Sequence, residues 1–157
     1  MVKIAICDDD AQAVARQEAI VRQSLQKAGI QCALTTYTQS GNLLADLRDD
    51  GFFYDLILLD IEMPGLDGMA LARQAQTVLP HVRIVFVTSH TEYAIDAFEL
   101  SIFRYVPKDS LETKLAAAVT DAAKLVELET GQSYGIQPGS RCSGGCLWSW
   151  GAMKLPG

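Results

Sequence analysis

Short apolar runs alternate with longer segments of mixed character through the first 130 residues of the chain. Five runs read as strands, at residues 3–7, 32–37, 56–59, 84–87 and 102–106. The run at 56–59 is apolar throughout, whereas the last run is more mixed. Continuous apolar strands are typical of a parallel sheet covered on both faces, so we expect the central runs to be buried strands of such a sheet.

The segments that follow these runs carry apolar residues at helical spacing. In the first of them, Val14, Val21, Leu25 and Ala28 fall on one helical face, and Gly29 stands where a helix C-cap belongs. The further helices predicted are one capped by Ser40 and ended by Gly51, one from Met69 to Val78, one over residues 91–99 and one from Leu111 to Val126. The chain therefore repeats a strand–helix unit five times.

This repeat, with right-handed crossovers, limits the fold to a few topologies. The sequence predicts an α/β fold: a doubly wound five-stranded parallel sheet with helices on both faces. In such folds the functional site lies beyond the carboxyl ends of the strands, where the strand order reverses. Candidate chemistry is therefore expected at that edge.

Composition narrows the class of protein. With 49% apolar and 20% charged residues, the 157-residue chain has the balance of a globular protein rather than a disordered one. Its net charge of −6 argues against a surface built for nucleic-acid phosphates. The sequence contains no apolar run long enough for a membrane span, and its N-terminus lacks the features of a secretory signal. We expect a cytoplasmic location and no membrane partner.

The composition changes sharply near residue 130. Residues 131–157 hold seven of the 12 glycines, both tryptophans and no acidic residue. The first 130 residues carry all 19 acids and 11 of the 13 bases, a net charge of −8. We expect one domain over residues 1–130 and an irregular tail over residues 131–157. A linker, fused residues or a truncated downstream segment would each explain that tail.

The four cysteines form two unlike pairs. Cys7 and Cys32 lie in apolar runs and are expected to be buried, inert thiols. Cys142 and Cys146 lie in the polar tail, without further histidine or acidic ligands nearby. A closed zinc site needs four ligands, so the tail pair is weak evidence for a metal, and a cytoplasmic location disfavours a disulfide.

Polar residues follow the strand runs where the sheet edge is expected. They are Asp8 and Asp9, then Asp60, then Thr88, then Lys108. Each has an ordinary explanation taken singly, because one acid of residues 8–10 can cap the first helix and the others can be turn or surface residues. Their joint placement at one sheet edge is better explained by a functional site.

Three close carboxylates repel one another unless a cation lies among them. A hard divalent ion with oxygen ligands resolves that repulsion, and we expect Mg²⁺. The Thr88 hydroxyl and the Lys108 ammonium are suited to the equatorial oxygens of a phosphoryl group. Together these residue types describe a site where an aspartate attacks phosphorus.

At these residues the chain resembles the receiver domain of bacterial two-component response regulators, over about residues 2–128. The matching segments are Asp8-Asp9, residues 58–68 around Asp60, Val87-Thr88-Ser89 and Tyr105-Val106-Pro107-Lys108. The resemblance implies that Asp60 is the phosphoacceptor and that Asp8 and Asp9 bind Mg²⁺ with the backbone carbonyl of Glu62. It also implies that Thr88 and Lys108 contact the phosphoryl group, and that Tyr105 is an aromatic switch that turns inward when Thr88 moves.

Two further segments refine the resemblance. Residues 6–9 and 88–99 are similar to receivers of LytTR-type transcription regulators, which are commonly partnered by membrane histidine kinases. The family often has proline directly after the conserved lysine, whereas here Pro107 precedes Lys108 and Asp109 follows it, which leaves the path of Lys108 open. Only 27 residues follow residue 130, too few for a DNA-binding domain of that type, so we expect no direct nucleic-acid binding by this fragment.

The resemblance predicts a flavodoxin-like sheet with strand order 2-1-3-4-5, in a signalling domain that catalyses only its own phosphorylation and dephosphorylation. Its partners would be a sensor histidine kinase and, after phosphorylation, a second copy of the chain, with control of transcription in the full-length protein. His90 and Glu62 flank the site where the family tunes the lifetime of the phosphate. Two alternatives stay open: a receiver-like binding module that works without phosphate, and an aspartate-nucleophile phosphatase, whose acid–base aspartate would be replaced here by Glu62.

Overall fold

The computed structural model describes residues 1–49, 53–65, 67–89, 92, 97 and 99–130. One compact unit extends from Met1 to Ala123 and holds the whole sheet, and a second begins at Lys124. The described part of the second unit is the end of the last helix. The predicted boundary at residue 130 remains a prediction, and Gly51, His90, Cys142 and Cys146 lie outside the described residues.

Five parallel strands form the sheet, in the order β2-β1-β3-β4-β5, which confirms the predicted fold. The strands are β1 (Val2–Cys7), β2 (Cys32–Tyr37), β3 (Leu56–Leu59), β4 (Arg83–Thr88) and β5 (Arg104–Pro107). In β3 all four residues are buried, and in β4 only Arg83 is not. This burial explains why the central strands read as continuous apolar runs.

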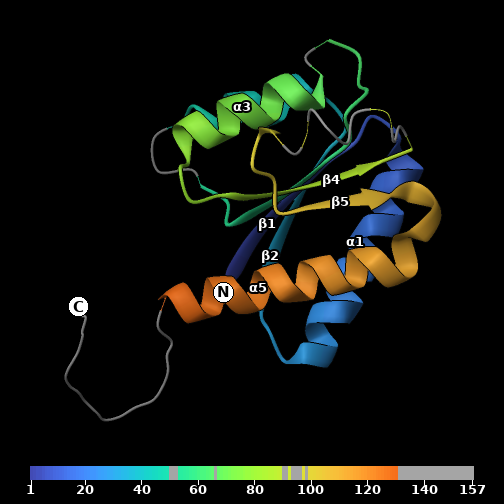
Figure 1. Ribbon diagram of the computed structural model, residues 1–157, viewed down its shortest axis with the longest axis vertical. Helices are drawn as coiled ribbons and strands as arrows, with labels where there is room; N and C mark the ends of the chain where they lie inside the picture. The colour runs from blue at the N-terminus through green and yellow to red at the C-terminus, as the bar shows by residue number, and fades with distance from the viewer. Residues whose placement is uncertain (50–52, 66, 90–91, 93–96, 98, 131–157) are drawn as a thin grey trace. The chain divides into compact units, whose positions relative to one another are not determined.

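The helices cover both faces of this sheet. They are α1 (Ala11–Ala28), α2 (Ser40–Leu47), α3 (Gly68–Val78) and α5 (Ala116–Thr130), with a 3₁₀ turn, Lys108–Ser110, and a π-helical segment, Leu111–Leu115, ahead of α5. Figure 1 shows α3 on one face of the sheet and α1 on the other. Across the described ranges, no helix combines the length and apolar character that a membrane crossing requires.

Local side chains set where these helices begin and end. Asp10 caps α1 by accepting a hydrogen bond from the Gln12 amide at 3.0 Å, and Gly29 ends that helix at φ +72°. This outcome confirms the expected glycine cap and selects Asp10 from the three consecutive acids. The prediction for Ser40 was wrong, because Ser40 is the first helical residue and Gln39 occupies the cap position without a side-chain cap bond.

Three other predictions need correction. Strand β4 includes Thr88, and β5 begins at Arg104 rather than residue 102, after Ser101 turns the chain at φ +58°. Cys32 is half-buried rather than buried, because it lies on β2 at the edge of the sheet. Most of the helix predicted over residues 91–99 lies outside the described residues.

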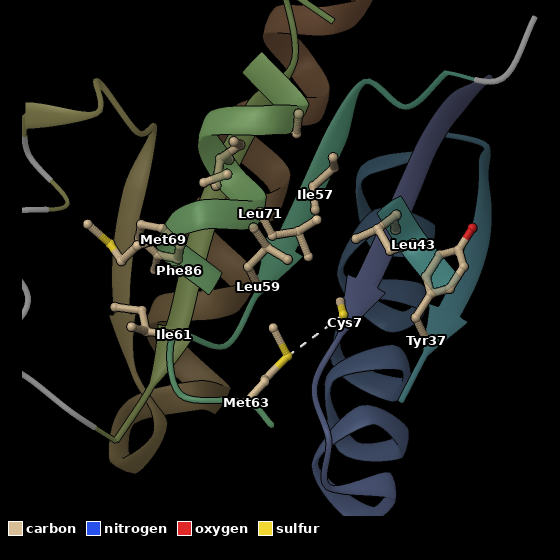
Figure 2. Packing of buried hydrophobic residues seen from close by; sticks show 14 of the residues in the cluster. Cys7, Tyr37, Leu43, Ile57, Leu59, Ile61, Met63, Met69, Leu71 and Phe86 are labelled. Carbon is tan, nitrogen blue, oxygen red and sulfur yellow. Dashed lines mark hydrogen bonds between the residues drawn. The ribbon is translucent and has the colours of Figure 1, made fainter. Parts of the chain in front are cut away.

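The buried cluster between the sheet and helices α2 and α3 extends to the edge where β1 and β3 end. The Cys7 thiol points at the Met63 sulfur, 3.8 Å away, which ties β1 to the loop after β3 (Figure 2). At the end of β2, the buried Tyr37 hydroxyl hydrogen bonds with Asp46 of α2 and with Tyr54, at 2.5 and 2.6 Å. The core therefore fixes three strand ends next to the predicted site.

Candidate functional site

The predicted polar residues converge because their strands are neighbours in the sheet. Asp8 follows β1 and Asp60 follows the adjacent β3, and the Asp60 amide donates to the Cys7 carbonyl at 3.1 Å. Thr88 ends β4 and is paired in register with Pro107 of β5, so Lys108 begins where the sheet stops. The carboxyl ends of parallel strands meet at one edge, and that edge gathers the five side chains.

Three carboxylates lie together at this edge. Asp8, Asp9 and Asp60 each place a carboxylate oxygen within 4.8 Å of the others. Asp8 is completely buried and Asp60 is 6% exposed, whereas Asp9 is exposed. Two of the three carboxylates are therefore buried, and the exposed Asp9 connects the cluster with solvent.

Lys108 is the cation that faces this cluster. Its ammonium nitrogen lies 2.8 Å from Asp8 Oδ2 and 3.2 Å from Asp60 Oδ2. The sequence left open whether the backbone would carry Lys108 to the site, because Pro107 precedes it and Asp109 follows it. In the structure Lys108 reaches the site. Partial burial acts to lower the pKa of Lys108, but its hydrogen bond to Asp8 and the charges of Asp8 and Asp60 outweigh that effect and raise the pKa.

Asp8 is held from several sides. Its Oδ1 accepts the Asp10 amide at 3.0 Å, and its Oδ2 accepts the side-chain amide of Gln17 at 3.3 Å, in addition to Lys108. Sequence reasoning missed Gln17. The available signal was its spacing, because Gln17 lies three residues after Val14 and four before Val21 on the predicted buried face of α1.

Asp60 differs from Asp8 in one oxygen. Within the described residues, Asp60 Oδ1 is the buried side-chain oxygen that has no hydrogen-bond partner. A buried polar atom without a partner costs about 1–3 kcal/mol, so it usually marks a place where an ion, water or ligand belongs. Oxygen ligands from three carboxylates are what a hard divalent cation requires, and these residues therefore fit Mg²⁺.

The other predicted residues lie on β4, on β5 and in the loop after β3. Thr88 is completely buried at the end of β4. Tyr105 is half-buried on β5, with its ring edge-to-face against Phe86 at 6.4 Å. Burial raises the pKa of Tyr105, and the charges of Glu92 and Asp60 raise it further. Glu62 lies two residues after Asp60 with its side chain exposed.

The loop after β3 is packed tightly onto Asp60. Asp67 caps α3 by accepting the Ala70 amide at 2.8 Å, and the Gly68 amide donates to the Ile61 carbonyl at 2.7 Å. A Cβ on Gly68 would lie 2.1 Å from the Asp60 carbonyl oxygen, so only glycine fits there. A cavity of about 600 Å³ opens beside Asp9, between the loops that precede α2 and α3.

Comparisons with known proteins agree with this geometry. Residues 4–120 match the family model of the response regulator receiver domain. Over 75% of its own length, the chain is 32% identical to the DNA-binding transcriptional regulator NtrC of Klebsiella pneumoniae. Over the same share of its length, it is 32% identical to the transcriptional regulatory protein NatR of Bacillus subtilis. It spans 24% and 48% of those two proteins.

Two solved structures show the same fold. The response regulatory domain of mrkE from Klebsiella pneumoniae superposes with a TM-score of 0.71 at 26% identity, covering 81% of this chain and 99% of that one. The response regulator TrrA from Thermotoga maritima, solved in complex with Mg²⁺-BeF, superposes with a TM-score of 0.62 at 25% identity, covering 78% and 99%. The chain belongs to the family of response regulator receiver domains.

Proposed function

We propose that Asp60 is a phosphoacceptor that takes a phosphoryl group from a sensor histidine kinase, with Mg²⁺ held by Asp8, Asp9, Asp60 and the backbone carbonyl of Glu62. The observation that carries the proposal is Asp60 Oδ1, which is buried beside two carboxylates and an ammonium and has no partner among the described residues. The Mg²⁺-BeF complex of TrrA, a relative of the same fold, supports the same reading.

In this reaction a carboxylate oxygen of Asp60 forms a bond to phosphorus while the phosphorus–nitrogen bond to the kinase histidine breaks. The electron pair of that bond stays on the imidazole. When bound, Mg²⁺ neutralises charge on the transferring group and on the three carboxylates. Lys108 is positioned to exchange its contacts with Asp8 and Asp60 for a phosphoryl oxygen, and the buried Thr88 hydroxyl would bind a second one.

The proposed output begins at Thr88 and Tyr105. Movement of Thr88 toward the phosphate would leave room for the Tyr105 ring to turn inward, and this change would create a surface for a second copy of the chain. We further propose that the full-length protein controls transcription as a LytTR-type regulator, since residues 6–9 and 88–99 carry that resemblance. The domain limits at residue 130 and a cytoplasmic location are part of the same proposal.

Acetyl phosphate labelling tests the phosphoacceptor. The wild-type chain should gain one phosphoryl group in the presence of Mg²⁺, and hydroxylamine should remove it. Asp60→Asn should abolish this labelling, whereas Asp109→Asn, which removes the same charge from an exposed residue beside Lys108, should leave it intact. Undiminished labelling of Asp60→Asn would refute the assignment.

The same assay separates the two alternatives. An aspartate-nucleophile phosphatase would release phosphate from a phosphoester over many turnovers, rather than retain a single labelled aspartate. A binding module that works without phosphate would show neither labelling nor Mg²⁺ binding. Either outcome would replace the proposed function.

A further inference from the structure

A glutamine lies where α1 packs on the sheet. Gln17 is 1% exposed and occupies the buried face of α1 together with Val14, Val21 and Leu25. A buried amide is costly unless its polar atoms are hydrogen bonded, whereas an apolar side chain there would continue the pattern of that face. The position therefore calls for an explanation that packing alone does not supply.

The explanation lies in the contact that Gln17 makes. Its side-chain nitrogen donates to Asp8 Oδ2 at 3.3 Å. That oxygen also receives Lys108 at 2.8 Å, while the Asp10 amide binds Oδ1 at 3.0 Å. Two of these donors are held in place, because the Asp10 amide belongs to the backbone and the Gln17 side chain is buried on the face of α1. Lys108 is a long side chain that is 23% exposed and can move.

We propose that Gln17 is a positioning residue that holds the Asp8 carboxylate in the orientation that binds Mg²⁺; this inference rests on the proposed function. When Lys108 turns to a phosphoryl group, Asp8 Oδ2 loses its strongest donor. Gln17 then remains as the side-chain donor to that oxygen. Together with the Asp10 amide, it keeps the carboxylate plane fixed while the ammonium leaves.

Direct titration of Mg²⁺ by calorimetry tests the proposal without any phosphodonor. Gln17→Met keeps a similar length and removes the donor. Loss of an outer-shell partner typically weakens metal affinity 10–100-fold, and because the Asp10 amide still holds Oδ1 we expect about 10-fold. At saturating Mg²⁺ the labelling rate should return close to that of wild type, since the defect lies in metal affinity.

The controls separate positioning from packing. Gln26→Met makes the same exchange at an exposed position of α1 and should not change Mg²⁺ affinity. Val14→Ala removes buried apolar volume from the same helix face, so it should lower the melting temperature and leave Mg²⁺ affinity unchanged. Gln17→Met should instead lower Mg²⁺ affinity and leave the melting temperature unchanged, because in the absence of metal Asp8 keeps its bonds to Lys108 and the Asp10 amide.

The possible outcomes are distinct. If wild type binds no Mg²⁺, the proposed function fails. If wild type binds Mg²⁺ and Gln17→Met binds it equally well, only the role of Gln17 is overturned. Should Gln17→Met not fold, Gln17→Asn decides, because it keeps an amide at the position but is too short to reach Asp8; wild-type affinity in that variant would overturn the proposal.

Discussion

Lys108 offers the sharpest test of the site, because its ammonium occupies the position of a counter-ion between two buried carboxylates. It lies 2.8 Å from Asp8 and 3.2 Å from Asp60, and those side chains are 0% and 8% exposed. Replacing it by methionine keeps the aliphatic stem and leaves both carboxylates without their cation. The stability of the domain in a Mg²⁺-free buffer should therefore fall.

The size of the fall follows from the surroundings. Removing one partner of a buried ion pair costs about 3–5 kcal/mol. The Lys108 side chain is 23% exposed, and Asp8 retains its bonds from Asp10 and Gln17, so we expect a cost at or below the lower limit of that range, about 2–3 kcal/mol. In urea this loss should lower the unfolding midpoint by roughly 1–2 M.

Mg²⁺ should reverse much of this loss. In wild type the ion has to displace Lys108 from Asp8 and Asp60, whereas in Lys108→Met nothing competes with it. The variant should therefore bind Mg²⁺ more tightly, and an ion concentration of a hundred times its dissociation constant would add about 2.7 kcal/mol. Lys114→Met, an exposed lysine on the following π-helical segment, is the matched control and should change neither quantity.

Equilibrium urea unfolding with chelator and with Mg²⁺ measures both effects. The reasoning is wrong if Lys108→Met is as stable as wild type in chelator. It is also wrong if Mg²⁺ stabilises wild type and variant equally, because the Lys108 ammonium and the ion would then not compete for the same carboxylates.

Two further predictions concern residues around the site. Gly68→Ala should cost roughly 1–3 kcal/mol and slow labelling of Asp60, because its Cβ would lie 2.1 Å from the Asp60 carbonyl oxygen; Gly41→Ala, whose Cβ meets nothing within 4 Å, is the control in urea unfolding and acetyl phosphate assays. Burial, and then the charges of Asp8, Asp60 and Asp9, raise the pKa of Cys7 to about 12 from 9.0. As the pH rises, the thiol of the unfolded chain ionises before the thiol of the folded chain, so the free energy of unfolding should fall above pH 9 by up to about 1.4 kcal/mol per pH unit. Chemical denaturation between about pH 9 and 10 should show a flatter slope for Cys7→Ala. An unchanged slope would contradict the pKa shift.

The fold was predictable because its strongest signals are long and periodic. Strands β2 and β3 have the predicted bounds, since their apolar runs stop at turn residues. Boundaries that depend on one backbone angle or one cap were not predictable. The residue Ser40 has the chemistry of a cap but lies inside α2, and Ser101 turns the chain before β5 begins.

The site was predictable in its residue types but not in its contacts. Parallel strands bring Asp8, Asp60 and Lys108 to one edge, and the repeated strand–helix unit predicts such a parallel sheet. Periodicity assigns Gln17 to a buried face without saying what it touches. Its bond to Asp8 depends on how α1 packs against β1, which is a tertiary feature that a sequence pattern does not contain.

The two buried carboxylates of the site are not equivalent, and the difference assigns their roles. Asp8 accepts hydrogen bonds on both oxygens, which fixes its plane and still leaves a lone pair on Oδ1 for an ion. Asp60 accepts Lys108 on Oδ2, while Oδ1 has no donor in the part of the chain that the structure describes. A nucleophile needs a lone pair that is not already engaged, whereas a metal ligand benefits from being held still. This asymmetry is why we assign phosphoryl transfer to Asp60 and ion binding to Asp8, and labelling at Asp8 in the Asp60→Asn variant would contradict it.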